Sequence, residues 1–246
     1  MSTSQQKVAF VTGGARGIGA AIVERFTADG TKVAFTYANG HDAASALVER
    51  LGKAGAEVIA IQADSSNEDA VVAAIAKTVE HFGGLDIVVN NAGGGTFAPL
   101  HEQADEEIRQ MIDVNIWGTV LVTRHAIPHL GEGGRIVNIG SINGDRTPFP
   151  GGSIYAMTKG AITSFTRALS RELGPRGITV NNVQPGPVDT DANPADGPGA
   201  GFLVEHIAVG HYGHVDDISG MVAYLVSEQG KFITGATLNV DGGFSA

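Results

Sequence analysis

The chain has 246 residues, of which 43% are hydrophobic, so it can bury the core of one large domain, and we expect a single domain over 1–246. Its formal charge of -10 disfavours a nucleic-acid backbone or an anionic membrane as the main partner. The absence of cysteine excludes disulfides, thiolate metal sites and cysteine nucleophiles. The polar N-terminus predicts no signal peptide, and no apolar run approaches the ~18 residues of a membrane span, so we expect a cytoplasmic protein.

Short runs rich in β-branched and apolar residues alternate along the chain with longer segments of helical periodicity. This alternation predicts an α/β fold with a doubly wound parallel sheet, Rossmann-like, of about seven strands with helices on both faces. The predicted strands are 8–12, 32–37, 57–62, 85–90, 135–140, 179–184 and 236–240. Gly30, Gly55 and Gly177 each fall between a helical stretch and a strand, where a glycine ends a helix.

A glycine-rich turn follows the first predicted strand and opens the first helix, with glycines at Gly13, Gly17 and Gly19. Backbone amides at such a helix start, together with the positive end of the helix dipole, can hold a pyrophosphate. The spacing differs from the Gly-x-Gly-x-x-Gly dinucleotide fingerprint, so by itself the turn also fits an ordinary connection between strand and helix.

Tyr155 and Lys159 lie four residues apart in a predicted helix and therefore project from one face. A cation ~4 Å from a phenol at an effective dielectric constant of ~20 is worth roughly 4 kcal/mol. We expect this pairing to lower the pKa of Tyr155 towards physiological pH, where a general acid or base is most effective.

The segment 185–213 is rich in proline, glycine and aspartate and contains one short apolar piece, 202–209. It follows a predicted strand end, where ligands bind in open parallel sheets. We expect a long functional loop with one small helix, acting as a substrate lid over about 189–213.

These motifs resemble the short-chain dehydrogenase/reductase family over essentially the whole chain. The resemblance rests on the glycine turn and the Tyr-x-x-x-Lys pair, and also on Asn90-Asn91-Ala92-Gly93, Asn115, Ser141, Pro185-Gly186 and Asp241-Gly242-Gly243. Within the family the chain is similar to the 3-oxoacyl-carrier-protein reductases and related carbonyl reductases. The stretches 141–146 and 184–194 also resemble a bacterial biofilm-dispersal relative that binds a cyclic dinucleotide.

The resemblance implies hydride transfer between a nicotinamide cofactor and a carbonyl or secondary alcohol. Tyr155 would be the acid/base, Ser141 would hydrogen-bond the substrate carbonyl, and Lys159 would hold the ribose. Asn115 would bind a relay water through its backbone. The rival hypothesis is a sensor that keeps the fold and binds a nucleotide-like ligand in the same pocket.

The end of the second predicted strand carries no acidic residue that could bind the adenosine ribose, and Arg16 offers a positive charge nearby. This favours NADP(H) over NAD(H). By the same resemblance Asp64 and Ser65 would contact the adenine edge; Asp64 could also cap the following helix, and both roles could hold. The predicted cofactor site comprises Gly13, Arg16, Gly17, Ile18, Gly19, Tyr37, Ala38, Asn39, Asp64, Ser65, Asn91, Ala92, Gly93, Tyr155, Lys159, Pro185, Gly186, Val188 and Thr190.

We expect no metal site, because the i, i+4 pair His125 and His129 has no third ligand in the sequence around it. His211 and His214 could reach substrate or cap the next helix. The substrate is expected to be a small molecule in an apolar-walled pocket formed by Ile142, Phe149, Ile154, Phe202, Leu203, Val204 and Ile207. By family resemblance the protein should be a homotetramer, with the helices around Asn115 and Tyr155 at one interface.

Overall fold

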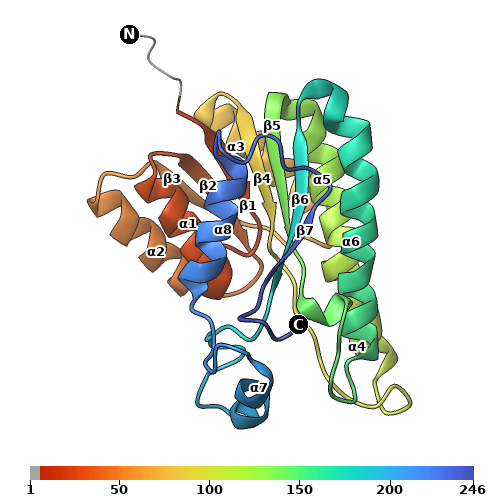
Figure 1. The fold of residues 1–246 in the computed structure, drawn as a ribbon. Helices are drawn as coiled ribbons and strands as arrows, with labels where there is room; N and C mark the ends of the chain where they lie inside the picture. The colour runs from red at the N-terminus through yellow and green to blue at the C-terminus, as the bar shows by residue number, and fades with distance from the viewer. Residues whose placement is uncertain (1–5) are drawn as a thin grey trace.

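A seven-stranded parallel sheet with strand order β3-β2-β1-β4-β5-β6-β7 forms the centre of the molecule (Figure 1). The structure is a computed structural model that describes residues 6–246, so most of the polar N-terminal stretch considered for a signal peptide lies outside it. Within residues 6–246, no helix combines the length and the apolar character needed to cross a membrane.

The strands alternate with helices as the sequence predicts. The strands are β1 Val8–Val11, β2 Lys32–Tyr37, β3 Val58–Gln62, β4 Leu85–Asn90, β5 Leu130–Ile139, β6 Thr179–Pro185 and β7 Thr237–Val240. The α-helices are α1 Gly17–Ala28, α2 His41–Lys53, α3 Glu68–Phe82, α4 Asp105–Ile112, α5 Thr119–Ala126, α6 Ser153–Leu173, α7 Ala200–His206 and α8 Val215–Val226. A π-helical turn, η1 Asp113–Gly118, joins α4 to α5, and short 3-10 turns occupy η2 Ile127–His129, η3 Ile142–Gly144 and η4 Gly174–Arg176.

All seven predicted strands are present, and β5 shows the largest difference in boundary. It begins at Leu130 rather than at Arg135, because the strand continues through an irregular glycine-rich stretch, 131–134, in which Gly133 has a φ of 74°. Leu130 pairs with Leu85 across a register irregularity in β4. The helix stops are confirmed, since Gly30, Gly55 and Gly177 all have positive φ, between 66° and 86°.

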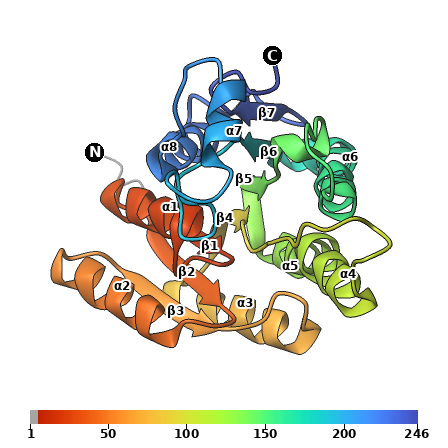
Figure 2. The same cartoon turned by 90° about the horizontal axis from the view of Figure 1, so that it is seen from below.

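The two faces of the sheet bury separate apolar layers, because successive strand side chains point to opposite sides. In β1, Val11 packs into the layer under α1, α2 and α8, whereas Phe10 packs into the layer under α3, α5 and α6. Figure 2 shows these two helical layers on either side of the sheet. Helix α7 lies outside both layers, beyond one end of the sheet (Figure 1).

A row of buried amides crosses the middle of the sheet. Asn90, Asn138 and Asn182 occupy matching positions in β4, β5 and β6 and are at most 4% exposed. The Asn90 amide donates to Asn138 Oδ1 at 2.8 Å, and the Asn138 amide donates to Thr166 Oγ1 of α6 at 2.8 Å. This row fixes α6, which carries the predicted catalytic pair, against the sheet.

Replacing Asn138 by alanine should lower the free energy of unfolding by about 2–4 kcal/mol, because two buried polar partners lose their hydrogen bonds. Urea denaturation followed by circular dichroism measures the loss. The matched control is Asn239→Ala, an exposed asparagine of β7, which should change stability by no more than about 0.5 kcal/mol. An equal loss of free energy of unfolding in both variants would show that the hydrogen bonds of the amide row do not stabilise the fold.

Candidate active site

A cavity of about 960 Å³ opens at the carboxyl ends of the strands. Here β1 and β4 are neighbours in the sheet. The strand that follows β1 in sequence lies on one side of this pair, and the strand that follows β4 lies on the other side. Such a reversal creates the crevice in which open α/β sheets bind their ligands. The cavity therefore lies where the topology predicts a nucleotide site.

The glycine turn forms one wall of this cavity. Gly13 and Gly17 have φ of 65° and 53°, a conformation that other residues rarely adopt. Gly19 lies so close to the Gly13 carbonyl that a Cβ on Gly19 could not fit without a shift of the turn. The turn thus brings its backbone and the start of α1 to the cavity, as a pyrophosphate cradle requires.

Asn91 and Thr12 join this turn to the next strand. The Asn91 side chain donates to the carbonyls of Thr12 and Gly13 at 2.9 and 3.0 Å. In return, Thr12 Oγ1 accepts the backbone amides of Asn91 and Ala92 at 3.0 and 2.9 Å. The two motifs, far apart in the sequence, therefore form one rigid floor for a ligand.

Asn115 lies behind the cavity rather than on its wall. Its side chain accepts the Gly94 amide at 3.0 Å and donates to the Gly94 carbonyl at 2.8 Å and to Thr158 Oγ1 at 3.0 Å. The residue stands in the π-helical turn η1, a rare geometry that occurs often at functional sites. Asn115 thereby holds the loop after β4 against α6.

Ser141 lies two residues after the end of β5 and lines the cavity. Its hydroxyl oxygen accepts the Asn143 amide at 3.2 Å, which leaves its own proton free to be donated. Its carbonyl accepts a 2.9 Å hydrogen bond from the fully buried Gln184 of β6. Sequence reasoning missed Gln184, because an isolated glutamine in an apolar strand gives no recognisable signal.

Tyr155 and Lys159 both line the cavity from the first turns of α6. Lys159 Nζ donates to the Ile139 carbonyl at 3.0 Å and lies 5.8 Å from the centre of the Tyr155 ring. Burial lowers the pKa of Lys159 to about 8. Burial also raises the pKa of Tyr155, an effect that the neighbouring Ser141 hydroxyl partly offsets.

The expectation that the lysine lowers the pKa of Tyr155 is therefore wrong for this structure. The sequence estimate placed the ammonium ~4 Å from the phenol and did not include the removal of both groups from water. Desolvation penalises the charged form of each side chain, so it raises the pKa of Tyr155 and lowers the pKa of Lys159. Tyr155 and Lys159 line the same cavity, as the sequence predicts. Burial, rather than the charge of the lysine, is the main cause of the shift in each pKa.

Arg16 reaches the end of β2, where the cofactor preference was expected to be decided. Its Nη2 atom lies 2.7 Å from the position that a Cβ on Gly40 would occupy. Ala38 and Asn39 line the cavity beside it, and the Asp64 and Ser65 pair lines it from the next strand end. The Arg16 guanidinium thus lies beside the end of β2, and β2 contributes no carboxylate to this part of the cavity wall.

The helix cap considered at this edge is wrong. Asp64 does not cap α3, because its carboxylate accepts from Ser66 and the cap is Asn67, which accepts the Ala70 amide at 3.0 Å. Tyr37 does not line the cavity. Its side chain is buried, and its hydroxyl lies 2.9 Å from His41 Nδ1.

Apart from Tyr37, every residue of the predicted cofactor site lines the cavity, from Gly13 to Thr190. Phe97 and Phe244 line it too and were missed, since neither belongs to a recognised motif. Of the predicted apolar wall residues, Ile142, Phe149, Phe202 and Leu203 line the cavity. Ile207 instead packs with Ile142 and Phe244 beneath α7.

Two of the histidines considered from the sequence, His125 and His214, have structural partners. His125 contacts Glu68 of α3 at 2.7 Å, a carboxylate that its sequence neighbourhood did not reveal. His214 caps α8 by accepting the Asp216 amide, with Asp217 completing a capping box. Among residues 6–246, no three His, Asp or Glu side chains gather in a group that could hold a metal ion.

Comparison with known proteins agrees with the fold. Residues 13–245 match the family model described as enoyl-(acyl carrier protein) reductase. A cyclic-di-GMP-binding biofilm dispersal mediator protein from Escherichia coli K12 is 44% identical over 98% of both chains. A short-chain dehydrogenase/reductase from Serratia marcescens is 49% identical, with a TM-score of 0.96 over 98% of this chain and 99% of that one.

A Burkholderia cenocepacia short chain dehydrogenase in complex with NADP is 46% identical, with a TM-score of 0.96 over 98% of this chain and 99% of that one. These likenesses extend from the glycine turn through the Tyr155 and Lys159 pair to the C-terminal residues. The chain belongs to the short-chain dehydrogenase/reductase family of oxidoreductases.

Proposed function

We propose that this oxidoreductase is an NADPH-dependent carbonyl reductase that converts a ketone to a secondary alcohol and can run in reverse as an alcohol dehydrogenase. The observation that carries the proposal is the joint presence of Ser141, Tyr155 and Lys159 on a cavity that also contains the glycine turn. When bound, the nicotinamide cofactor would supply the hydride.

The chain's own residues would position the carbonyl and supply a proton. Ser141 is free to donate its hydroxyl proton to the carbonyl oxygen, because Asn143 already occupies one of its lone pairs. Tyr155 would protonate the nascent alkoxide, and its raised pKa keeps it protonated before the reaction. Lys159, held by the Ile139 carbonyl, would bind the ribose and return the proton to Tyr155.

The glycine turn, Asn91 to Gly93 and Pro185 to Thr190 would hold the cofactor. The positive φ of Gly13 and Gly17 and the crowded position of Gly19 create a cradle that side chains would fill, which fits a diphosphate. Arg16 beside Gly40 suits an additional phosphate. The NADP bound to the Burkholderia relative and the NADPH bound to a metagenomic blue fluorescent relative support the same choice here.

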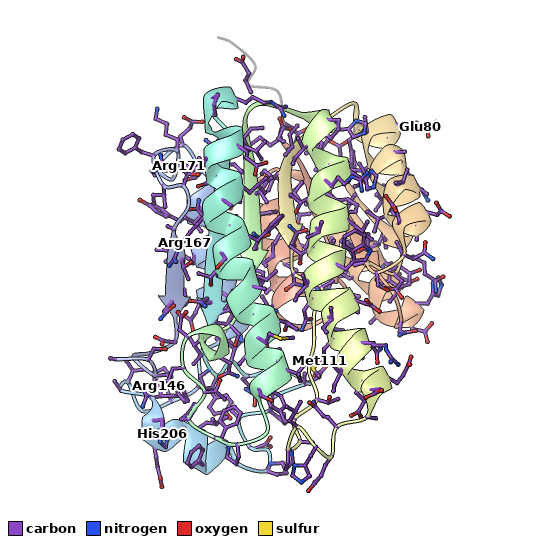
Figure 3. All side chains as sticks on the ribbon, turned by 90° about the vertical axis from the view of Figure 1, so that its right-hand side faces the viewer. Glu80, Met111, Arg146, Arg167, Arg171 and His206 are labelled. Carbon is purple, nitrogen blue, oxygen red and sulfur yellow. The ribbon has the colours of Figure 1, made fainter. Side chains whose placement is uncertain are left out.

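Helix α7 and its flanking segments would act as the lid, over about 189–213, and the protein would assemble as a homotetramer. Trp117 of η1 and Met157 of α6 are 44% and 48% exposed, so each offers apolar surface for contact with a second copy. Figure 3 shows the outer face of α6, with the exposed Arg167 and Arg171 at the side of this helix.

The alternative function is a sensor for a cyclic dinucleotide, favoured by the likeness to the E. coli biofilm dispersal mediator. Asn115, Ser141, Tyr155 and Lys159 are all present, which supports catalysis in this chain. Flat NADPH absorbance with ketones, diketones, quinones and 3-oxoacyl thioesters, combined with tight calorimetric binding of cyclic di-GMP, would favour the sensor.

Tyr155→Phe should lower kcat about 10²–10⁴-fold on any ketone that the wild type reduces, because the proton donor is lost. NADPH affinity, measured by titration calorimetry, should change little. The matched control is Tyr224→Phe, which removes an exposed hydroxyl on α8. A Tyr155→Phe enzyme that keeps more than about a third of the wild-type kcat contradicts the assigned role.

The lowered pKa of Lys159 predicts that the free energy of unfolding depends on pH. Between its folded pKa of about 8 and its ordinary value of 10.5, the unfolded chain holds a proton that the folded chain has released. Stability must therefore rise with pH in this window. Relative to Lys159→Met, the wild type should gain about 2 kcal/mol in free energy of unfolding between about pH 7.5 and about pH 9.5.

Chemical denaturation across this range measures the gain. Lys77→Met, which removes an exposed lysine of α3, controls for the loss of a lysine as such. Parallel stability curves for the wild type and Lys159→Met would mean that Lys159 is not desolvated in solution.

Ala38→Asp should reverse the nucleotide preference, because its carboxylate would face the additional phosphate of NADPH. Such a like-charge contact costs on the order of 1–3 kcal/mol, or about ten- to hundredfold in affinity. The neutral isostere Ala38→Asn separates charge from size, and Arg16→Ala should weaken NADPH more than NADH. The measurement is kcat/KM for both cofactors. Wild-type preference for NADH, or shifts below about threefold, would refute the assignment.

A further inference from the structure

Three aromatic rings from separate segments meet at the mouth of the cavity. The Phe97 ring, from the loop after β4, lies 5.3 Å from the Tyr155 ring and 5.8 Å from the Phe149 ring, measured between centroids. The Phe97 and Phe149 rings meet edge to face, at 66°. Because these distances fall within the range of attractive ring pairs, the catalytic tyrosine forms one end of an aromatic cluster.

The loops that carry Phe97 and Phe149 are fixed to one another. The Ala98 amide donates to the Gly151 carbonyl at 3.1 Å, and Gly151 has a φ of 89° that favours glycine. The buried Gln103 side chain donates to the Thr96 carbonyl at 3.2 Å. The rings are therefore held in place by the backbone before any ligand arrives.

Glycines at this wall leave room for the rings. A Cβ on Gly95 would lie 2.5 Å from the Tyr155 ring, so the loop backbone packs directly on the catalytic side chain. A Cβ on Gly152 would contact both the Phe97 and Phe149 rings, at 3.7 and 3.5 Å. Because these glycines have no side chains, the surface of this wall consists mainly of the aromatic rings.

Phe202 offers a fourth ring from the α7 side. It lines the same cavity and is 45% exposed, while Phe97 is 52% exposed. Both rings thus have surface that a ligand could bury. Helix α7 is supported by the buried cluster of Ile142, Ile207 and Phe244, which also contacts Leu203.

The side chains of this part of the cavity carry no formal charge. Its lining in the described chain comes from 93–97, 141–155 and 198–203, together with Gln110, Val114 and Phe244, and includes no Lys, Arg, Asp, Glu or His. The charged lining residues Arg16, Asp64, Lys159 and Asp191 come from the glycine turn, the β3 end, α6 and the segment after β6. A carboxylate or a polyhydroxylated sugar would therefore find few partners beside Tyr155.

We propose that Phe97, Phe149 and Phe202 form an aromatic subsite beside Tyr155, and that the substrates are ketones in which a planar aryl group adjoins the carbonyl. This inference rests on the proposed carbonyl reductase function. An aryl ring contributes burial against the exposed faces of Phe97 and Phe202, and each well-placed ring pair adds about two- to tenfold in affinity. The aryl group fixes the direction in which the carbonyl points to Ser141 and Tyr155.

The test compares two vicinal diketones that differ only in a phenyl for a methyl group, 1-phenyl-1,2-propanedione and 2,3-butanedione, with NADPH and the full-length protein. We expect the wild-type kcat/KM to be at least about tenfold higher for the phenyl compound. Phe97→Leu and Phe202→Leu should each reduce this preference about fivefold or more, mainly through KM. Phe232→Leu, which replaces a 99% exposed ring far from the cavity mouth, should leave both values unchanged.

The subsite is refuted if the wild type prefers the phenyl compound by less than about threefold, or if the leucine variants slow both diones equally. Failure to reduce either dione would instead refute the reductase function for this substrate class. Calorimetric binding of the phenyl dione to the protein with NADP⁺ then decides the subsite separately. The subsite stands if Phe97→Leu weakens that binding about fivefold or more and falls if the affinity is unchanged or the wild type does not bind.

Discussion

The exchange of hydrogen bonds between Asn91 and Thr12 determines the geometry of the site more than any other interaction. It joins the ends of β1 and β4, the two strands between which the sheet order reverses. The two side chains bond only to backbone carbonyls and backbone amides of the chain itself, so these hydrogen bonds form without a ligand. Gly19 and Gly13 can then approach because neither has a side chain. The geometry of the wall that the glycine turn forms follows from this one contact between distant parts of the chain.

The side of the cavity that carries the proposed catalytic residues depends on polar groups that have been removed from water. Asn138 secures α6 to the sheet, Asn115 secures the loop after β4, and Gln184 secures Ser141. Buried polar contacts of this kind are costly unless each partner is satisfied, and they permit few alternative arrangements. Lys159 shows the same cost, since burial lowers its pKa to about 8. Burial thus accounts both for the importance of these polar contacts and for the lowered pKa of Lys159.

The sequence allowed the prediction of the seven strands, the helix stops and most of the cavity lining, because these follow from local pattern and recognised motifs. It could not reveal contacts between segments that share no motif, such as His125 with Glu68 or Gln184 with Ser141. The pKa of Tyr155 was mispredicted because spacing on a helix says nothing about burial. The lid, the homotetramer and the cytoplasmic location stay predictions.

The two walls of the cavity mouth differ in how closely they are tied to Tyr155. Phe97 touches the Tyr155 ring, and its loop packs on the same ring through Gly95. Phe202 stands on α7, outside the two helical layers, where its own ring partner is His206. Phe97 is therefore part of the packing around Tyr155, whereas Phe202 lies on a separate element. In evolution, substrate range can diverge through α7 while the proton donor remains untouched.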